Sequence, residues 1–107
     1  MKVRDLLIDD SFRLTVEGNL DAEITGCYCG DLLSWVMSHI KPHQVWCTVL
    51  SHVNIVAVAS LTQVSSIIIC EDAPLEEATL NKAKQESINI IATSLTSAEV
   101  ARRILNG

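Results

Sequence analysis

Apolar and polar positions follow two different spacings in the first part of the chain. Apolar residues spaced as on one face of a helix predict a short helix over residues 2–8. Leu14 and Val16 alternate with polar neighbours, which predicts a strand over residues 13–17 with both apolar side chains on one face. A Gly-Asn turn follows, and residues 23–29 predict a second strand.

From residue 23 onward the pattern repeats as a strand followed by a helix. The predicted strands are 23–29, 45–50, 64–70 and 89–93, and the predicted helices are about 31–40, 52–61, 74–87 and 97–105. This alternation predicts an α/β fold: a mainly parallel sheet with right-handed crossovers and flanking helices. No linker, repeat or low-complexity tract interrupts it, so residues 1–107 are interpreted as a single domain.

Residues with capping preferences mark the starts of the helices. Asp31 is expected to cap the first of the four, because its carboxylate can accept the free N–H groups of the first turn. Ser51 is expected to cap the next, Pro74 fits the first turn of the third, and Thr96 with Glu99 has the spacing of a capping box. The last helix is expected to bury a stripe formed by Val100, Ala101, Ile104 and Leu105.

A stretch without charged residues runs from residue 42 to residue 70. It is long enough to span a bilayer, but polar runs interrupt it twice, so a buried strand–helix–strand core is favoured and no membrane segment is expected. The helix within it, residues 52–63, is either enclosed by the domain or lies at an oligomer interface. Because so small a domain rarely buries a helix on all sides, we expect a homodimer through this His52–Gln63 helix.

Composition and charge exclude several classes of protein. Hydrophobic residues make up 49% of the chain, which excludes intrinsic disorder. The net charge of −5 comes from 13 acidic and 8 basic residues, and the basic ones form no face that would bind nucleic acid. The acidic start of the chain lacks an apolar secretory segment, so we expect a cytoplasmic protein with reduced thiols.

The cysteines raise the question of a metal site. Cys27 and Cys29 lie two apart on a predicted strand and therefore on one face, where Cys47, His43 or His52 can complete a ligand set. The C-x-C spacing is not the C-x-x-C of zinc knuckles, and no matching second pair exists. We interpret these thiols, together with that of Cys70, as small core side chains, and we expect no metal and no cofactor.

The common catalytic motifs are missing from the sequence. Glycines occur only at positions 18, 26, 30 and 107, so the chain has neither a phosphate loop nor a dinucleotide-binding turn. It has no G-x-S-x-G nucleophile elbow and no H-E-x-x-H zinc helix. No set of nucleophile, base and orienting group is visible, so we predict no catalytic residue and no enzyme. The less favoured alternative is an enzyme built on His52, Asp31 and the thiols.

Polar residues gather where the predicted strands end and helices begin. Open parallel sheets bind ligands at the carboxyl ends of their strands, and helix N-termini there offer free N–H groups to anions. The predicted ligand-binding residues are Gly30, Asp31, Ser51, His52, Asn54, Glu71, Asp72, Thr93 and Ser94. The alternative is that each of them is an ordinary capping residue.

Four runs of residues resemble the DRTGG domain family and together extend over nearly the whole chain. They are Asp21–Gly26, Tyr28–Met37, Ser51–Ala59 and Ile90–Ser94. The family is similar in fold to the N-terminal domain of HPr kinase/phosphorylase, and its members also occur beside CBS domains and within some phosphotransacetylases. This chain departs from the family's Gly-Gly pair, because Cys27 follows Gly26.

The resemblance implies a regulatory or ligand-sensing accessory domain, often dimeric. By analogy with proteins that combine DRTGG and CBS domains, we expect a stand-alone homodimer that binds an adenine nucleotide or another small anion. Kinase activity is not carried over, because the phosphate loop is missing. The alternative function is a structural accessory subunit of a larger enzyme or redox complex, with a protein partner in place of a small ligand.

Overall fold

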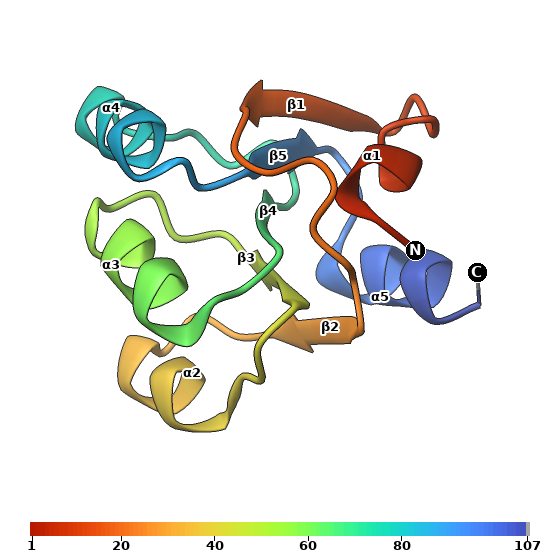
Figure 1. The fold of residues 1–107 in the computed structure, drawn as a ribbon, viewed down its shortest axis with the longest axis horizontal. Coiled ribbons are helices and arrows are strands. Elements are labelled where there is room, and N and C mark those ends of the chain that lie inside the picture. Colours follow the sequence, from red (N-terminus) through yellow and green to blue (C-terminus); the bar gives the residue numbers. More distant parts are fainter. Residues whose placement is uncertain (107) are drawn as a thin grey trace.

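Residues 1–106, the part that this computed structural model describes, form a five-stranded sheet flanked by helices (Figure 1). In chain order the elements are α1 (Val3–Leu6), β1 (Phe12–Val16), β2 (Gly26–Cys29), α2 (Leu33–His39), β3 (Gln44–Thr48), α3 (Asn54–Thr62), β4 (Ser66–Ile69), α4 (Glu77–Glu86), β5 (Ile90–Thr93) and α5 (Ser97–Leu105). The strand order is β1-β5-β4-β3-β2, with β1 antiparallel to β5 and all other pairs parallel. The predicted α/β fold with a mainly parallel sheet is confirmed.

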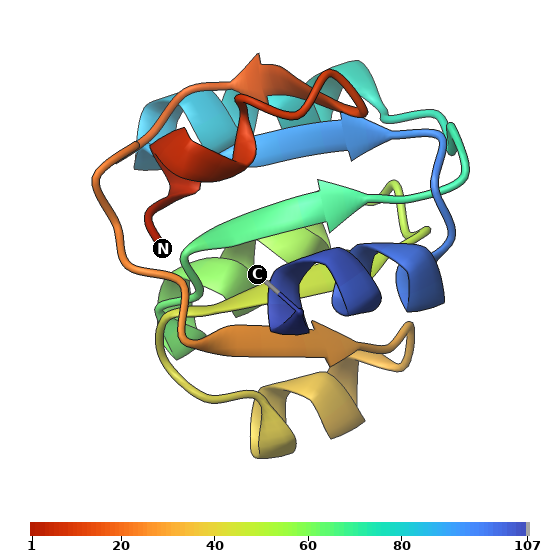
Figure 2. The same cartoon turned by 90° about the vertical axis from the view of Figure 1, so that its right-hand side faces the viewer.

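Helices cover both faces of the sheet. Figure 2 shows α1 and α5 in front of the sheet, whereas α2, α3 and α4 lie behind it. α2, α3 and α4 each connect two neighbouring parallel strands, and α5 packs back mainly onto β2. Because the order from β2 to β5 runs in one direction, the parallel strands lack the reversal of order that opens a ligand crevice in many α/β sheets.

The central strand β4 is buried along its whole length. Ile67 and Ile69 pack in the core beneath α2, α3 and α4, and Ile68 packs in the core beneath α1 and α5. Each of these side chains is almost fully buried, which contributes about 1.5–3 kcal/mol apiece to folding. Because both faces of the strand are covered, its sequence is continuously apolar instead of alternating.

An irregularity in β1 changes the direction of its apolar side chains. Phe12 packs in the core beneath α1 and α5, but Val16 packs in the opposite core. The pairing with β5 shifts register between Leu14 and Val16, and such a bulge reverses the face that the following residues occupy. Leu14 stays 37% exposed. The prediction that Leu14 and Val16 share a face is therefore wrong.

Asp31 does not cap α2, contrary to prediction. The N-cap position is held by Leu32, and no side chain accepts a hydrogen bond there. The Asp31 carboxylate instead accepts hydrogen bonds from the Thr48 hydroxyl at 2.6 Å and the Val49 N–H at 3.0 Å. It therefore joins the end of β2 to the end of β3.

The remaining helix ends are predicted with mixed success. Ser51 lies two residues before the N-cap of α3, and Pro74 precedes the first turn of α4, so both expected roles are wrong. The capping box of α5 is confirmed, because Thr96 and Glu99 exchange hydrogen bonds in both directions. Leu105 is 67% exposed and does not belong to the buried stripe of α5.

The uncharged helix α3 is buried on one side only. Its buried residues are Ile55, Val56, Val58 and Ala59. Ala57 and Ser60 are exposed, and Leu61 is 72% exposed, so the domain does not enclose this helix. Within residues 1–106, none of the helices combines the length and the apolar character needed to cross a membrane.

Candidate functional site

The nine residues predicted to bind a ligand lie at one edge of the sheet. Gly30 and Asp31 follow β2, and the pair Glu71–Asp72 follows β4. The remaining five are placed by β3, α3 and β5: Ser51, His52, Asn54, Thr93 and Ser94. Because β2 to β5 are parallel, these loops all leave the sheet at its carboxyl edge. We call this set of nine residues the carboxyl-edge site.

Gly30 and Asp31 are held firmly by β3. The Gly30 N–H donates to the Cys47 carbonyl at 3.2 Å, and the Gly30 carbonyl accepts from the buried Trp46 indole at 2.9 Å. The Thr48 hydroxyl donates to Asp31 and accepts from the Leu50 N–H at 3.2 Å. These bonds fix the position of the Asp31 carboxylate at the edge.

The loop between β3 and α3 presents a hydroxyl and an imidazole. The Ser51 hydroxyl lies 3.5 Å from the Glu76 carboxylate, and the Ser51 carbonyl accepts from the Thr79 hydroxyl at 2.6 Å. His52 Nδ1 accepts from the Asn54 N–H at 3.2 Å. That bond requires the tautomer with a proton on Nε2, so the exposed His52 ring can donate a hydrogen bond outward.

Glu71 and Asp72 form a tight turn with a left-handed backbone. Their φ angles are 59° and 53°, and the Ala73 N–H closes the turn onto the Cys70 carbonyl at 3.1 Å. Two consecutive positive φ angles with this hydrogen bond define a type I′ turn, which glycine or asparagine usually occupies. The Asp72 carboxylate pairs with Arg13 at 3.3 Å, whereas the Glu71 carboxylate is exposed.

The charge at this edge is predominantly negative. The exposed carboxylates of Asp31, Glu71, Asp72 and Glu76 lie on its loops, and Arg13 is paired with one of them. Phosphate groups alone are repelled by such a surface, but a divalent cation that bridges carboxylates and phosphates removes the repulsion.

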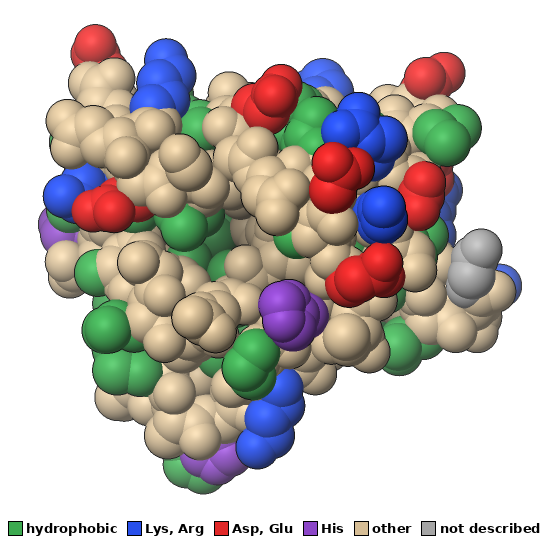
Figure 3. Space-filling model, in the orientation of Figure 1, with side chains coloured by type: hydrophobic (Ala, Val, Ile, Leu, Met, Phe, Trp, Pro, Cys, Tyr) green, Lys and Arg blue, Asp and Glu red, His purple; other side chains and the backbone are tan. Residues whose placement is uncertain are grey.

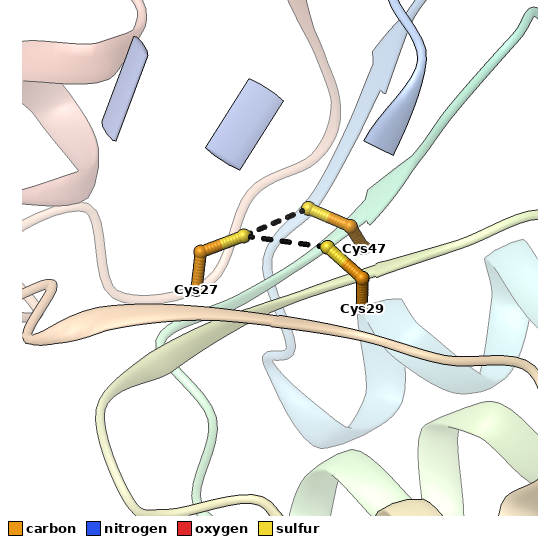
Figure 4. A group of neighbouring side chains, drawn as sticks. All are labelled: Cys27, Cys29 and Cys47. Carbon is orange, nitrogen blue, oxygen red and sulfur yellow. Dashed lines mark hydrogen bonds between the residues drawn. The ribbon is translucent and has the colours of Figure 1, made fainter. Parts of the chain in front are cut away.

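A second cluster lies on the α5 side of the sheet, where three cysteine sulfurs converge. Cys27 Sγ is 3.3 Å from Cys47 Sγ and 3.9 Å from Cys29 Sγ, and all three sulfurs lie within 4.8 Å of one another (Figure 4). The register pairs Cys29 with Cys47 across β2 and β3, which places the three thiols on one face. His43 and His52, the other ligands considered from the sequence, are not part of this group among the described residues.

The thiols of this cluster and of the adjacent Cys70 have different acidities. The pKa of Cys29 is lowered to about 6, chiefly by the neighbouring Cys47 thiol, whose effect outweighs the opposing effect of burial. The pKa of Cys47 is raised, because its hydrogen bonds to Cys27 and then to Cys29 retain its proton. The pKa of Cys70 is lowered, again first by Cys47. Cys29 therefore ionises near neutral pH.

The opposite, amino edge of the sheet contains a hollow of about 330 Å³ that the sequence did not indicate. Figure 3 shows the recess in this face, between the ends of α3 and α4. The buried Asn89 side chain lies at its wall and bonds to Gly18 N–H, the Asn19 carbonyl and the Ser65 carbonyl. These bonds already use both amide groups of Asn89, so we assign it a structural role.

The fold and site define an α/β domain with polar loops at the carboxyl edge of a parallel sheet. No protein-family model matches the sequence, and no curated protein matches it either. Among solved structures, it is similar to the CBS and DRTGG domains of the regulatory region of Clostridium perfringens pyrophosphatase, crystallised with its activator diadenosine tetraphosphate. The TM-score is 0.73 at 14% sequence identity, over 97% of this chain and 46% of that chain. The chain therefore has a DRTGG-like fold, as the resemblance in sequence implied, and spans less than half of that neighbour.

Proposed function

We propose that this chain is a non-catalytic regulatory domain that binds an adenine nucleotide or another small anion and works as a homodimer in the cytoplasm. The observation that carries the proposal is the likeness in fold, over 97% of the chain, to a pyrophosphatase regulatory region whose activator is diadenosine tetraphosphate. Regulatory domains of this kind change an activity carried by another domain or subunit, so the domain itself needs a ligand site and a contact surface but no catalytic groups.

The hydrogen bonds of the described residues support a non-catalytic role. Within residues 1–106, none of the side-chain hydrogen bonds joins a histidine to a cysteine or to a carboxylate. His39 stacks on Trp35, and His52 accepts from a backbone N–H. A nucleophile activated by a neighbouring base, itself oriented by a third group, is the usual sign of covalent catalysis. The Ser38 hydroxyl does lie 2.9 Å from His39 Nδ1, but the same nitrogen lies 2.9 Å from the Trp35 carbonyl, and no carboxylate among the described residues bonds to the ring.

The carboxyl-edge site is the proposed ligand site. His52 can donate to the ligand from Nε2, whereas the first three N–H groups of α3 are already bonded to His52 and Val53 and are not available to it. Because four carboxylates lie on these loops, the nucleotide is expected to bind as its Mg²⁺ complex, with the ion between the phosphates and one or two carboxylates. Glu71 is the best candidate for such a contact, since its carboxylate is exposed and forms no ion pair in the described chain.

The outward side of α3 is the proposed dimer surface. It is uncharged and presents Ala57, Ser60 and Leu61, next to a groove of about 240 Å³ between α3 and α4. The region over α2 and α3 shows very few charged side chains in Figure 3, in contrast to the rest of that face. Small residues on a helix allow a second backbone to approach, and Leu61 of each copy is positioned to fill apolar space at the contact.

A role as a structural accessory subunit is the second candidate. The observation that favours it is the exposure of large apolar side chains around α2 and α3: Leu32 is 65%, Trp35 58%, Met37 46% and Leu61 72% exposed. Exposed apolar residues gathered on one part of a surface often mark a contact with another protein. In this case the same surface binds a different chain instead of a second copy.

Isothermal titration of the purified protein with AMP, ATP and diadenosine tetraphosphate, each with and without Mg²⁺, tests ligand binding. We expect binding that Mg²⁺ strengthens, at least about tenfold weaker binding for His52→Ala and for Glu71→Gln, and unchanged binding for the exposed control Gln85→Ala. Absence of heat at millimolar ligand, with and without Mg²⁺, refutes the nucleotide-sensing role and leaves the accessory role.

Light scattering at several concentrations tests the dimer. We expect a mass twice the 11.7 kDa of one chain, and a monomer for Leu61→Glu. Leu105→Glu is the matched control, because Leu105 is also exposed but lies on α5, on the other face of the sheet. A wild-type monomer at the highest concentration contradicts the homodimer.

A further inference from the structure

Three sulfur atoms from two adjacent strands point at one another beneath the start of α5. Cys27 Sγ approaches both Cys47 Sγ, at 3.3 Å, and Cys29 Sγ, at 3.9 Å (Figure 4). Cys47 is buried, Cys27 is half-buried and Cys29 is exposed. The cluster is thus anchored in the core and open to solvent on one side, unlike cysteines that only fill core space.

The spacing of the sulfurs matches the size of a thiophilic metal ion. Two of the three sulfur–sulfur distances are 3.3 and 3.9 Å, and the third, between Cys29 and Cys47, is at most 4.8 Å. With the third distance at this upper limit, the point equidistant from the three sulfurs lies about 2.4 Å from each of them. Zinc–sulfur bonds in proteins are about 2.3 Å long. One ion at the centre therefore contacts all three sulfurs with little movement of the strands.

We propose that Cys27, Cys29 and Cys47 form a binding site for one thiophilic divalent cation, with Zn²⁺ as its representative. The three thiolates are the protein ligands, and a small ligand such as water completes the coordination of the ion. Sites with three protein ligands keep one position for water or another small ligand, in contrast to structural sites, which use four. This proposal is independent of the proposed nucleotide binding.

The exposed member of the cluster lies against the start of α5. Cys29 Sγ lies 3.8 Å from the Ser97 carbonyl, at the first residue of the nine-residue α5. The Cys29 thiol donates to this carbonyl, and it gives up that bond when it binds a metal ion as a thiolate.

The positions of the three thiols suit a metal ion better than a disulfide bond. Cys27 and Cys47 have the closest sulfurs, but the register pairs Cys47 with Cys29 and pairs Cys27 with Val45. The backbone of Cys27 is therefore displaced from that of Cys47 by about 6.6 Å along the strand and by about 4.8 Å between the strands. The two Cα atoms are then about 8 Å apart, beyond the usual range for a disulfide. A disulfide also leaves the third thiol without a partner, whereas a metal ion uses all three.

Titration of the full chain, reduced and freed of metal with a chelator, tests the site. With Zn²⁺ we expect one ion per chain, a Kd of about 1 μM or tighter, and a Tm raised by about 10 °C at a hundredfold excess over Kd. With Co²⁺ we expect the ultraviolet charge-transfer absorption of thiolate ligands. Both readouts are independent of any activity.

Two single substitutions make the test specific. Cys29→Ser removes an exposed ligand without opening a cavity and is expected to weaken Zn²⁺ binding at least about 100-fold, with folding unchanged by circular dichroism. Cys70→Ala is the matched control, because Cys70 lies on the same face but outside the group of three, and binding is expected to stay within about threefold. Wild-type affinity in Cys29→Ser, an equal loss in Cys70→Ala, or a Co²⁺ complex without thiolate absorption overturns the proposal.

Discussion

Replacing Asn89 with alanine is expected to destabilise the domain more than any other single change to a polar side chain at the amino edge. Asn89 is only 3% exposed, and its amide joins three segments of the chain. Its oxygen accepts from Gly18 N–H at 2.6 Å, and its nitrogen donates to the carbonyls of Asn19 at 2.8 Å and Ser65 at 3.0 Å. The substitution breaks all three bonds and leaves three backbone groups to find other partners.

The size of the effect follows from those bonds. A protein hydrogen bond contributes about 1 kcal/mol net, so the loss of three predicts a decrease of about 3 kcal/mol in the free energy of unfolding. For a chain of 107 residues this corresponds to a Tm lowered by about 15 °C. Urea denaturation followed by circular dichroism measures the change, with the m-value expected to stay constant.

A matched control separates the hydrogen bonds from the loss of an asparagine. Asn81→Ala, at an exposed position of α4, is expected to change stability by less than about 0.5 kcal/mol. Asn89→Asp keeps the shape but turns a carboxylate oxygen toward two carbonyls, so it is expected to destabilise at least as much as Asn89→Ala. A loss below about 1 kcal/mol for Asn89→Ala refutes the reasoning.

Three further predictions concern a glycine, a thiol and a carboxylate. In Gly18→Ala the new Cβ meets the Ser87 carbonyl oxygen at 2.1 Å, so unfolding at equilibrium is expected to show a loss of about 2–3 kcal/mol, and an unchanged midpoint contradicts this. The rate of Cys29 alkylation by iodoacetamide, measured by mass spectrometry, is expected to fall as the pH is lowered through about 6, the lowered pKa of this thiol. A rate that falls with a midpoint near the ordinary pKa of 9.0 contradicts the lowered pKa. The Thr96 N–H lowers the pKa of Glu99 from 4.5, so its stabilising effect is present above pH 4.5 and is lost as pH falls through the lower folded-state pKa. The stability difference between wild type and Glu99→Gln is therefore expected to decrease in acid. A difference that does not depend on pH contradicts the stabilising role of the ionised Glu99 carboxylate.

Much of the fold could be predicted because burial imposes simple periods on the sequence. The run Ser66–Ile69 is apolar without alternation because both faces of β4 are covered. The capping box of Thr96 and Glu99 was predictable because all its partners lie within one turn. Patterns of this kind depend on near neighbours in the sequence, so they survive whatever the tertiary arrangement is.

The errors arose where a distant partner changed a local preference. Asp31 has the residue type of an N-cap, but Thr48 and Val49, brought close by strand pairing, take its carboxylate. Leu14 and Val16 lost their common face to a bulge that only the pairing with β5 produces. Strand register and strand order are long-range properties, and neither can be read from local spacing.

The same limit applied to the two candidate sites. The residues of the carboxyl-edge site were placed together because the carboxyl ends of parallel strands always share an edge. The thiol cluster was only half visible, since Cys27 and Cys29 share a face by their spacing but the position of Cys47 depends on the register of β2 with β3. The register of β2 with β3, which the sequence does not give, is what brings Cys47 to the other two cysteines.

The most direct test of the proposed function is to follow the backbone amides by ¹H–¹⁵N NMR while a nucleotide with Mg²⁺ is added. This measurement reports binding and its location together. The account predicts saturable shifts in the loops at residues 30–31, 51–54, 71–72 and 93–94, and smaller shifts at the amino edge. An unchanged spectrum at millimolar nucleotide, or shifts confined to other parts of the domain, contradicts the carboxyl-edge site as the place where this domain senses its ligand.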